Sequence, residues 1–429
     1  MIVDADLLIH SAAQVVTCVA DAPKRGAAMQ DVGLISDGAV AVKDGRILAV
    51  GPTESIRERY SAGQTINASG QIVCPGFVDP HTHVVYAGDR IGEFEQRIRR
   101  ATYLEIMAAG GGIVSTMRAT RQASVEELVE ATLPRLAQML RLGTTTAEVK
   151  TGYGLDLVSE LKMLEAIAAL DLAQPIDLVP TFLPAHAVPP EFNGRSAAYV
   201  DWVVNEMIPA AADWYRNSHF AKDSELSRRP FFNDIFCEQN AFDLDQSRRV
   251  LEAGIAHGLP AKIHADEFTS LGGVGLAVEL GAASVDHLDA TTPADAARLA
   301  ASGVVGIVLP AVNFNLGSHE FANARGLIDA GAAIALSTDI NPGSAPCPSQ
   351  PLVMAIATRY QRLLPAEALN AVTINAAFGV GLAEHIGSLA PGKQADLLVI
   401  NSSDYRQLAY QFGGNLVSAV VKNGRLLSL

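Results

Sequence analysis

Eight short apolar segments alternate with helix-forming segments through the middle of the chain, and this alternation constrains the fold more than any other feature. The expected strands are 71–78, 144–149, 176–183, 232–237, 261–264, 283–287, 304–309 and 333–338. Between two of them, Ser124 and Glu127 form a capping box ahead of an expected helix over 125–142, which Gly143 ends. Eight strands alternating with helices predict a parallel sheet closed into a (β/α)8 TIM barrel, an α/β fold.

The two ends of the chain carry matching strand patterns. Residues 5–8 and 395–398 both spell Ala-Asp-Leu-Leu, and the motifs Lys-Asp-Gly-Arg at 43–46 and Lys-Asn-Gly-Arg at 422–425 are each flanked by apolar residues. Such motifs are typical of type I′ hairpins. We therefore expect a small β-sandwich domain built from both termini. The expected domains are 1–70 and 369–429 for the sandwich and 71–368 for the barrel inserted between them.

Two long segments, 87–123 and 186–230, follow the carboxyl ends of expected strands. The first holds the glycine triplet 110–112, and the second is rich in Pro, Asn, Ser and charged residues. Segments of this length are usually lids or disordered insertions. The triplet matches no phosphate-binding pattern, so we interpret it as loop flexibility.

Polar side chains suited to metal binding stand where five of the expected strands end: His81, His83, His186, His264, His287 and Asp339. The first two are separated by one residue, and in an extended chain such side chains point the same way. The carboxyl ends of barrel strands open on one mouth. Each histidine alone is better explained as an ordinary core or surface residue, but their joint placement predicts one site.

The donor set that we expect to hold a metal is His81, His83, His264 and Asp339. Three imidazoles and a carboxylate suit one zinc or iron(II) ion and leave a position open for water. Two-metal barrels often need a lysine that ends the fourth strand, where this chain has Phe-Cys-Glu at 236–238. We therefore predict one divalent metal per chain. Lys150, at the end of the second strand, is expected to be a structural or surface lysine.

Two further residues have the chemistry of a hydrolytic site. Glu267 lies three residues after His264 and is placed to take a proton from water and pass it to a leaving nitrogen. Its alternative role is a glutamate stabilised by a helix N-terminus. His287 is expected to stabilise an oxyanion or orient the water, with a fifth metal bond as its alternative role.

Composition limits the partners. The chain has 429 residues and a formal net charge of −14, with no basic stripe that could neutralise phosphates, so we expect no nucleic-acid partner. An anionic substrate would need a local arginine. No uninterrupted apolar run reaches the roughly 18 residues of a membrane span, and the first residues are acidic rather than basic. The four scattered cysteines are expected to be reduced thiols of a cytoplasmic protein.

Several longer motifs make the chain resemble the amidohydrolase superfamily and, within it, the imidazolonepropionase family. His-Thr-His at 81–83 is shared across the superfamily. More specific are Gly-Asp-Arg at 88–90, Gly-Gly-Gly-Ile-Val-Ser-Thr at 110–116, Glu-Val-Lys-Thr-Gly-Tyr-Gly at 148–154, His-Ala-Asp-Glu at 264–267 and Ser-Thr-Asp-Ile-Asn-Pro-Gly-Ser at 337–344. The resemblance covers nearly the whole chain. Extra length at 219–230 departs from the family.

The resemblance implies the same four metal ligands and hydrolytic ring opening of 4-imidazolone-5-propanoate to N-formimidoyl-L-glutamate. It also implies a set of substrate contacts. Arg90 would bind the propionate carboxylate, with Tyr103 as a weaker candidate there, and Tyr153 and His186 would contact the ring. The remaining contacts would come from Glu267 and from three residues that follow the metal aspartate: Asn341, Gly343 and Ser344. The arginine fork suits a carboxylate. We expect a homodimer, since barrels of this type often pair.

Two other functions remain open at this stage. A metal-dependent deaminase of a purine-like or pyrimidine-like heterocycle can carry an identical metal site, although Arg90 and Tyr153 favour a ring that bears a propionate. A barrel that has lost catalysis and serves in binding or assembly would lack ligands or the base, and this chain keeps both.

Overall fold

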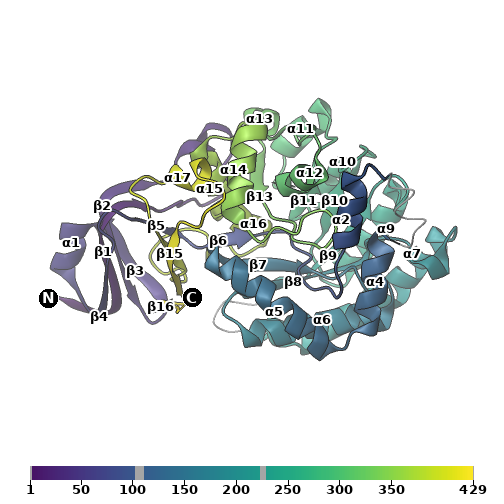
Figure 1. Cartoon of the computed structure of the whole chain (residues 1–429), viewed down its shortest axis with the longest axis horizontal. Coiled ribbons are helices and arrows are strands. Elements are labelled where there is room, and N and C mark those ends of the chain that lie inside the picture. Colours follow the sequence, from purple (N-terminus) through teal and green to yellow (C-terminus); the bar gives the residue numbers. More distant parts are fainter. Residues whose placement is uncertain (1, 102–110, 223–228, 429) are drawn as a thin grey trace.

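The structure is a computed structural model that describes residues 2–101, 111–222 and 229–428. Its larger part is a barrel of eight parallel strands, which pair in chain order from β6 to β13 (Figure 1). The barrel strands are β6 (Phe77–Asp79), β7 (Thr144–Lys150), β8 (Asp177–Ala185), β9 (Phe232–Cys237), β10 (Lys262–Ala265), β11 (Ser284–His287), β12 (Val305–Val308) and β13 (Ala333–Leu336). They are almost entirely buried, as expected for a parallel sheet covered by helices. The predicted fold class is confirmed.

Helices surround the barrel: α4 (Ile113–Gln122), α5 (Val125–Arg141), α6 (Leu157–Ala173), α9 (Leu244–Ala256), α10 (Gly273–Leu280), α11 (Pro293–Ala300), α12 (Pro310–Leu316), α13 (Ala324–Asp329), α14 (Gln350–Tyr360), α15 (Pro365–Ala371), α16 (Ile374–Gly379) and α17 (Gln407–Tyr410). The capping box predicted for α5 is present. Ser124 Oγ accepts from Glu127 N at 3.2 Å, and Glu127 Oε2 accepts from Ser124 N at 2.8 Å. These two bonds satisfy N–H groups that the helix itself leaves unpaired.

Side-chain bonds link the first and last barrel strands. The Asp79 carboxylate accepts from Ser337 Oγ, from Thr338 N at 3.0 Å and from Thr338 Oγ1 at 2.6 Å. Just beyond, His83 N donates to Ile340 O at 3.0 Å. These contacts hold the residues after β6 against those after β13, so that the two ends of the barrel sequence share one mouth.

A second sheet combines both termini and lies beside the barrel, with its purple and yellow strands together in Figure 1. Its order is β16-β15-β14-β5-β1-β2-β3, with β4 parallel to β1. The strands are β1 (Val3–Val16), β2 (Leu34–Lys43), β3 (Arg46–Pro52), β4 (Tyr60–Asn67), β5 (Ile72–Pro75), β14 (Leu397–Ile400), β15 (Val417–Lys422) and β16 (Arg425–Leu426), with η1 (Gly26–Gln30) and α1 (Thr53–Arg59) among them. N-terminal Leu7 and Val42 share a core cluster with C-terminal Leu397 and Val421.

Both predicted hairpin turns form. Asp44 and Gly45 have φ of 51° and 74°, and Asn423 and Gly424 have φ of 50° and 73°, as a type I′ turn requires at both central positions. Ala395 joins the two turns, because its N–H donates to Gly45 O at 2.8 Å and its carbonyl accepts from Gly424 N at 2.9 Å.

The first expected strand, 71–78, is divided in the structure. β5 pairs with β1 and β14 in the terminal sheet, whereas β6 pairs with β7 in the barrel. Gly76 lies at the division. A Cβ atom there would overlap Thr145 Oγ1 and come within 2.6 Å of Thr145 Cγ2, so the close passage of the backbone requires glycine.

The two long segments, expected to be lids or disordered insertions, are mostly helical where they are described. The first holds α2 (Ile91–Ile98) and α4. The second holds η2 (Pro190–Phe192), α7 (Ser196–Trp202), the π-helical turn η3 (Val203–Met207), α8 (Ile208–Asn217) and η4 (His219–Ala221). Tyr199, Val203 and Tyr215 are buried in the main core cluster. Burial of these side chains stabilises helices that the polar composition did not reveal.

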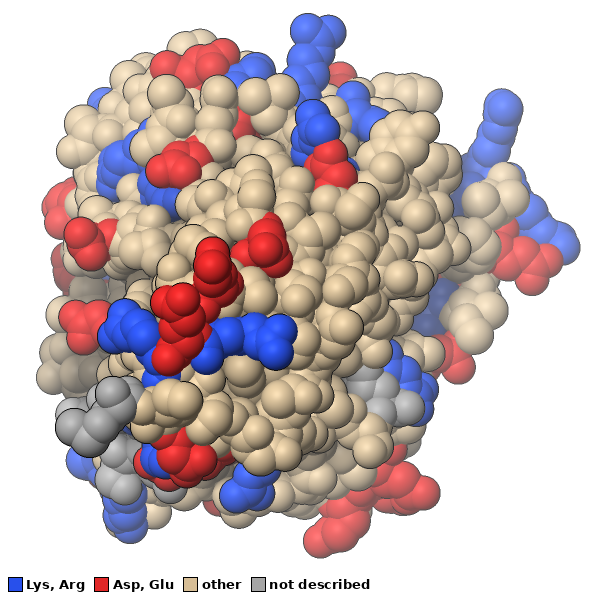
Figure 2. Space-filling model, turned by 90° about the vertical axis from the view of Figure 1, so that its left-hand side faces the viewer, with Lys and Arg blue, Asp and Glu red and all other residues tan. Residues whose placement is uncertain are grey.

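Among the described residues, no helix combines the length and the apolar character needed to cross a bilayer. Figure 2 shows the end of the molecule that carries the terminal sheet. Lys and Arg side chains lie there among Asp and Glu side chains, beside a broad area that holds neither kind.

Candidate active site

Metal-binding side chains converge at the carboxyl end of the barrel strands. His81 and His83 follow β6, His264 lies in β10, His287 ends β11 and Asp339 follows β13. Two overlapping groups, His81 with His83 and His264, and His81 with His287 and Asp339, each bring their donor atoms within 4.8 Å of one another. All five residues are buried.

The donor atoms of the four residues lie close to one another. His83 Nε2 lies 3.3 Å from His264 Nε2, and Asp339 Oδ1 lies 3.5 Å from His81 Nε2 and 3.7 Å from His83 Nε2. Within the described part of the chain, His81 Nε2 and Asp339 Oδ1 have no hydrogen-bond partner. Buried polar atoms are rarely left unpaired. The three imidazoles and the carboxylate therefore fit a divalent cation, which would satisfy all four.

Buried carboxylates orient two of the imidazoles from behind. His81 Nδ1 lies 2.6 Å from Asp286 Oδ2, and His264 Nδ1 lies 3.0 Å from Asp234 Oδ2. A proton held on His81 Nδ1 by Asp286 leaves the His81 Nε2 lone pair for a metal. Burial lowers the pKa of His81 and His83 well below the usual value, so both rings stay neutral, as ligation requires.

Lys150 ends β7 beneath this cluster and is fully buried, so it is a structural lysine rather than a surface one. Its Nζ lies 2.8 Å from Glu148 Oε1, 2.8 Å from Asp234 Oδ2 and 3.4 Å from Asp286 Oδ2. The ammonium group thus contacts both carboxylates that orient the histidines. Lys262 Nζ binds the other Glu148 oxygen at 2.7 Å.

Glu267 and His287 stand together beside the donor cluster. Glu267 Oε2 lies 3.7 Å from His287 Nε2, and the Glu267 side chain is 15% exposed. Burial, reinforced by the Asp339 carboxylate, raises the pKa of Glu267 well above the usual value. His287 itself has φ of 86°, an uncommon conformation for a residue with a side chain. Such strain is concentrated at functional sites.

The loop after Glu267 is fixed by Glu238, which follows β9. The Glu238 carboxylate accepts from Phe268 N at 2.9 Å, from Thr269 N at 3.1 Å and from the Thr269 hydroxyl. These bonds hold the backbone next to Glu267 in one conformation.

Tyr153 and His186 line the mouth next to His83. The His186 ring stacks on the His83 ring with centroids 4.8 Å apart, and the Tyr153 ring lies 5.7 Å from His83 and 5.5 Å from His186. His186 Nδ1 lies 3.1 Å from Gly152 O. Burial lowers the pKa of His186 to about 3, so this ring is neutral. The three rings form a wall that can stack on a flat heterocycle.

Arg90 and the loop after Asp339 meet at the same mouth. The Arg90 guanidinium binds Glu93 and touches Gly343, where a Cβ would overlap Arg90 Nη1. Asn341 shapes this loop: its Oδ1 accepts from Gly343 N at 2.8 Å and Ser344 N at 2.7 Å, and its Nδ2 donates to Ser344 Oγ at 2.9 Å. The Asn341 amide is thus engaged within the loop.

Tyr103, expected as a weaker contact to the carboxylate, lies outside the described residues. The structure brings the other expected site residues to the barrel mouth. It adds four acidic residues that sequence reasoning missed: Glu93, Asp234, Glu238 and Asp286. Asp234 and Asp286 could have been found from the sequence, because each is an acidic residue inside an apolar strand. A buried carboxylate without a partner destabilises the fold, so such a residue indicates a partner nearby.

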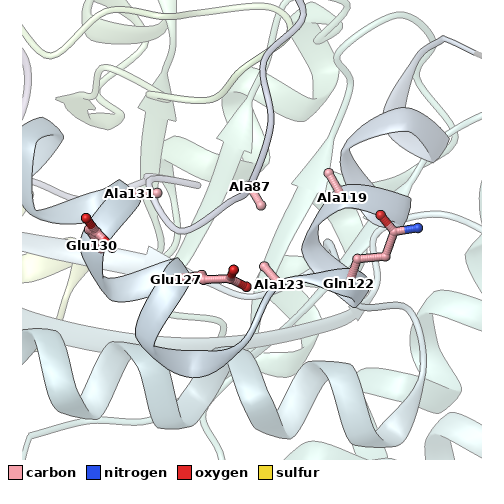
Figure 3. Close-up of a pocket in the computed structure, with 7 residues that line it drawn as sticks. All are labelled: Ala87, Ala119, Gln122, Ala123, Glu127, Glu130 and Ala131. Carbon is pink, nitrogen blue, oxygen red and sulfur yellow. The ribbon is translucent and has the colours of Figure 1, made fainter.

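A cavity of about 560 Å³ opens elsewhere, between the segment before α2 and helices α4 and α5 (Figure 3). It is lined by Ala87, Ala119, Gln122, Ala123, Glu127, Glu130 and Ala131. None of the expected site residues lines it, and its four alanines, two carboxylates and one amide include no histidine or cysteine that could join a metal site.

Comparison with known proteins agrees with this geometry. A model of the amidohydrolase family matches residues 247–427. The adenosine deaminase from Xanthomonas campestris with bound zinc is 21% identical, with a TM-score of 0.72 over 99% of this chain and 93% of that one. E. coli guanine deaminase is 16% identical, with a TM-score of 0.72 over 98% of each chain. The barrel and its histidine–aspartate cluster thus define an amidohydrolase.

Closer relatives narrow this class. The imidazolonepropionase of Chloroflexus aggregans is 59% identical over 423 residues, covering 98% of both chains, and that of Geobacillus kaustophilus is 46% identical over 429 residues, covering 98% of this chain and 97% of that one. A model described as an imidazolonepropionase-like composite domain of bacteria matches residues 38–60. The chain belongs to the imidazolonepropionase family. The family and the histidine-rich cluster together support a divalent metal in the barrel.

Proposed function

We propose that the chain hydrolyses 4-imidazolone-5-propanoate to N-formimidoyl-L-glutamate at the barrel mouth. The observation that carries this proposal is that one mouth joins a cluster fit for a metal to an arginine fit for a carboxylate. Arg90 contacts Gly343, which lies four residues after Asp339. Relatives that cover nearly the whole chain support the same activity.

The substrate would lie with its carboxylate on Arg90 and its ring near the histidines. A guanidinium can bind a carboxylate through two parallel hydrogen bonds, which fixes the far end of the substrate. Tyr153 and His186 would contact the ring, while Gly343 and Ser344, in the loop after Asp339, would lie next to the bound substrate. Tyr103 stays a further candidate for the carboxylate end.

A divalent metal held by His81, His83, His264 and Asp339 would lower the pKa of a water molecule towards about 7. Glu267 is placed to accept a proton from the attacking water as the oxygen of that water adds to the ring carbonyl. Its raised pKa suits this task, because the proton must be held and then released. Glu267 then passes the proton to the ring nitrogen as the cyclic C–N bond breaks.

His287 completes the reaction scheme. It lies beside Glu267 and can donate a hydrogen bond to the oxygen that becomes negatively charged during attack. The reaction is balanced, because one water molecule is added, one C–N bond is broken, and the new carboxylate carries the attacking oxygen.

The cofactor we propose is one zinc or iron(II) ion per chain. Three imidazoles and one carboxylate suit either metal, and the buried, ion-paired Lys150 supports a single ion. Elemental analysis of protein purified without added metal distinguishes the two ions.

A turnover assay tests the activity. Urocanase generates imidazolonepropionate in place, and its ultraviolet absorbance is followed with native and with chelated protein. We expect rapid decay that chelation abolishes and added zinc or iron restores. Decay no faster than the spontaneous background, from protein that holds its metal, would contradict the proposal. Ammonia release from guanine or cytosine would then support the deaminase alternative.

We also propose a cytoplasmic homodimer. Within the described residues the four cysteines are free thiols, three of them buried, which suits a reducing compartment. Light scattering of the purified chain at micromolar concentration tests the assembly, and a monomer mass would contradict it.

A further inference from the structure

Arg90 is held by a buried neighbour that sequence reasoning did not mark. Glu93 lies in the first turn of α2, and its Oε2 accepts from Arg90 Nε at 2.8 Å and from Arg90 Nη2 at 2.6 Å. The two side chains are only 10% and 16% exposed. An ion pair so shielded from water constrains the guanidinium far more than a surface pair would.

The contact with Glu93 decides which edge of the guanidinium a ligand can use. A guanidinium offers a side edge formed by Nε and one Nη atom, and an end formed by the two Nη atoms. Glu93 occupies the side edge with a single oxygen. No described residue is hydrogen-bonded to Nη1, which lies against Gly343, so the end formed by the two Nη atoms can receive a second carboxylate.

Gly343 limits the space around that end. A Cβ atom at this position would overlap Arg90 Nη1 and come within 2.6 Å of Arg90 Cζ. Gly343 is not among the described glycines with positive φ, so its backbone would accept alanine without strain. An alanine at this position would therefore displace the Arg90 guanidinium without straining the local backbone.

Glu93 and a second arginine tie this arrangement to its surroundings. The other Glu93 oxygen, Oε1, accepts from Gly112 N at 2.9 Å, at the start of α4. Arg97 Nη2, one turn further along α2, donates to Gly343 O at 2.8 Å. The start of α2, the start of α4 and the loop after Asp339 thus meet around one guanidinium.

We infer that Glu93 is a positioning residue for substrate recognition. Together with Gly343, it holds the Arg90 guanidinium so that the end formed by its two Nη atoms faces the substrate carboxylate. The site therefore selects a ring with a short carboxylate chain. This inference rests on the proposed function, because the carboxylate is that of the proposed substrate. It adds that selection depends on a residue that need not touch the substrate.

Two variants separate this role from simple support of the fold. In Glu93→Gln the amide oxygen can still accept from Gly112 N, but the amide nitrogen cannot accept from Arg90. In Gly343→Ala the new methyl group displaces the guanidinium while Glu93 stays intact. Glu95→Gln is the matched control, because Glu95 pairs with Arg99 on the exposed side of the same helix.

The probes are imidazole-4-propanoate and its neutral propanamide, which differ only in the carboxylate. Calorimetry measures both affinities on the native protein and on each variant, and steady-state kinetics measures kcat and KM with imidazolonepropionate. Arg90→Ala provides the value for complete loss of carboxylate recognition.

We expect Glu93→Gln and Gly343→Ala to weaken propanoate binding and raise KM about tenfold or more, as for loss of a charged hydrogen bond. Propanamide affinity and kcat should change less than about threefold, and Glu95→Gln should match the native protein. The inference would be overturned if a variant lost affinity for the propanoate and the propanamide equally, or if either variant bound the propanoate as tightly as the native protein. Native protein that binds the propanoate selectively without hydrolysing imidazolonepropionate would instead contradict the proposed function alone.

Discussion

Asp286 Oδ2 lies 2.6 Å from His81 Nδ1, with both side chains fully buried. The carboxylate accepts the Nδ1 proton, so His81 Nε2 is left as a bare acceptor that faces Asp339 Oδ1 at 3.5 Å. Two electron-rich atoms at this distance repel each other unless a cation lies between them. The buried contact between Asp286 and His81 therefore influences how tightly the donor cluster at the barrel mouth binds a metal.

Replacing Asp286 with Asn should lower metal affinity about 10-fold to 100-fold, the usual effect of losing a carboxylate behind a ligating histidine. The asparagine keeps the shape but no longer stabilises the Nδ1 proton with a negative charge. Competition with a chelator of known affinity measures the change. The surface variant Asp213→Asn, from an exposed pair with Arg216, serves as the control. Affinity equal to that of the native protein would show that Asp286 does not tune the ligand.

Glu267→Gln should reduce kcat by about 10²-fold to 10⁴-fold and leave the metal content unchanged. The amide keeps the hydrogen-bonding shape but cannot accept and return a proton, which is the contribution expected of a general base. Steady-state kinetics with metal-loaded protein measures the loss. Turnover within a few-fold of the native rate would remove Glu267 as the proton carrier.

Metal removal should abolish turnover and also destabilise the fold. A ligand that binds only the folded state stabilises it in proportion to the logarithm of its concentration over Kd. Without the cation, the Asp339 carboxylate remains packed against three imidazoles, and burial raises the pKa of Asp339 well above its usual value. Thermal unfolding of native and chelated protein measures the difference. An unchanged melting temperature would contradict a metal bound at this cluster.

The barrel and the donors at its mouth could be predicted because both depend on local pattern. Strand segments are short and apolar, and the carboxyl ends of barrel strands meet on one side, so His264 and Asp339 could be placed together although 75 positions separate them in the sequence. The hairpin turns were equally local, since Asp44-Gly45 and Asn423-Gly424 are marked by two adjacent residues.

Other features depended on contacts between distant segments. The division of the first strand at Gly76 follows from the approach of Thr145, and the carboxylates of Asp234 and Asp286 acquire meaning only once His264 and His81 lie beside them. The helices between 190 and 221 are stabilised by burial of Tyr199 and Tyr215 rather than by their polar composition. The role of Glu93 likewise depends on Arg90 and Gly112, which contact its carboxylate from outside α2.

Lys150→Met should destabilise the protein by about 3–5 kcal/mol, the usual effect of removing one partner from a buried ion pair. Burial alone would lower the pKa of Lys150, but the carboxylates of Asp234, Glu148 and Asp286 outweigh burial and raise it. The amine therefore stays protonated and cannot react with carbon dioxide to form the carbamate that would bridge two metals. Urea unfolding measures the loss, and Lys43→Met, from an exposed pair with Asp4, should cost less than about 1 kcal/mol. Equal effects of the two variants, or two metal ions per chain in the native protein, would contradict the structural role of Lys150.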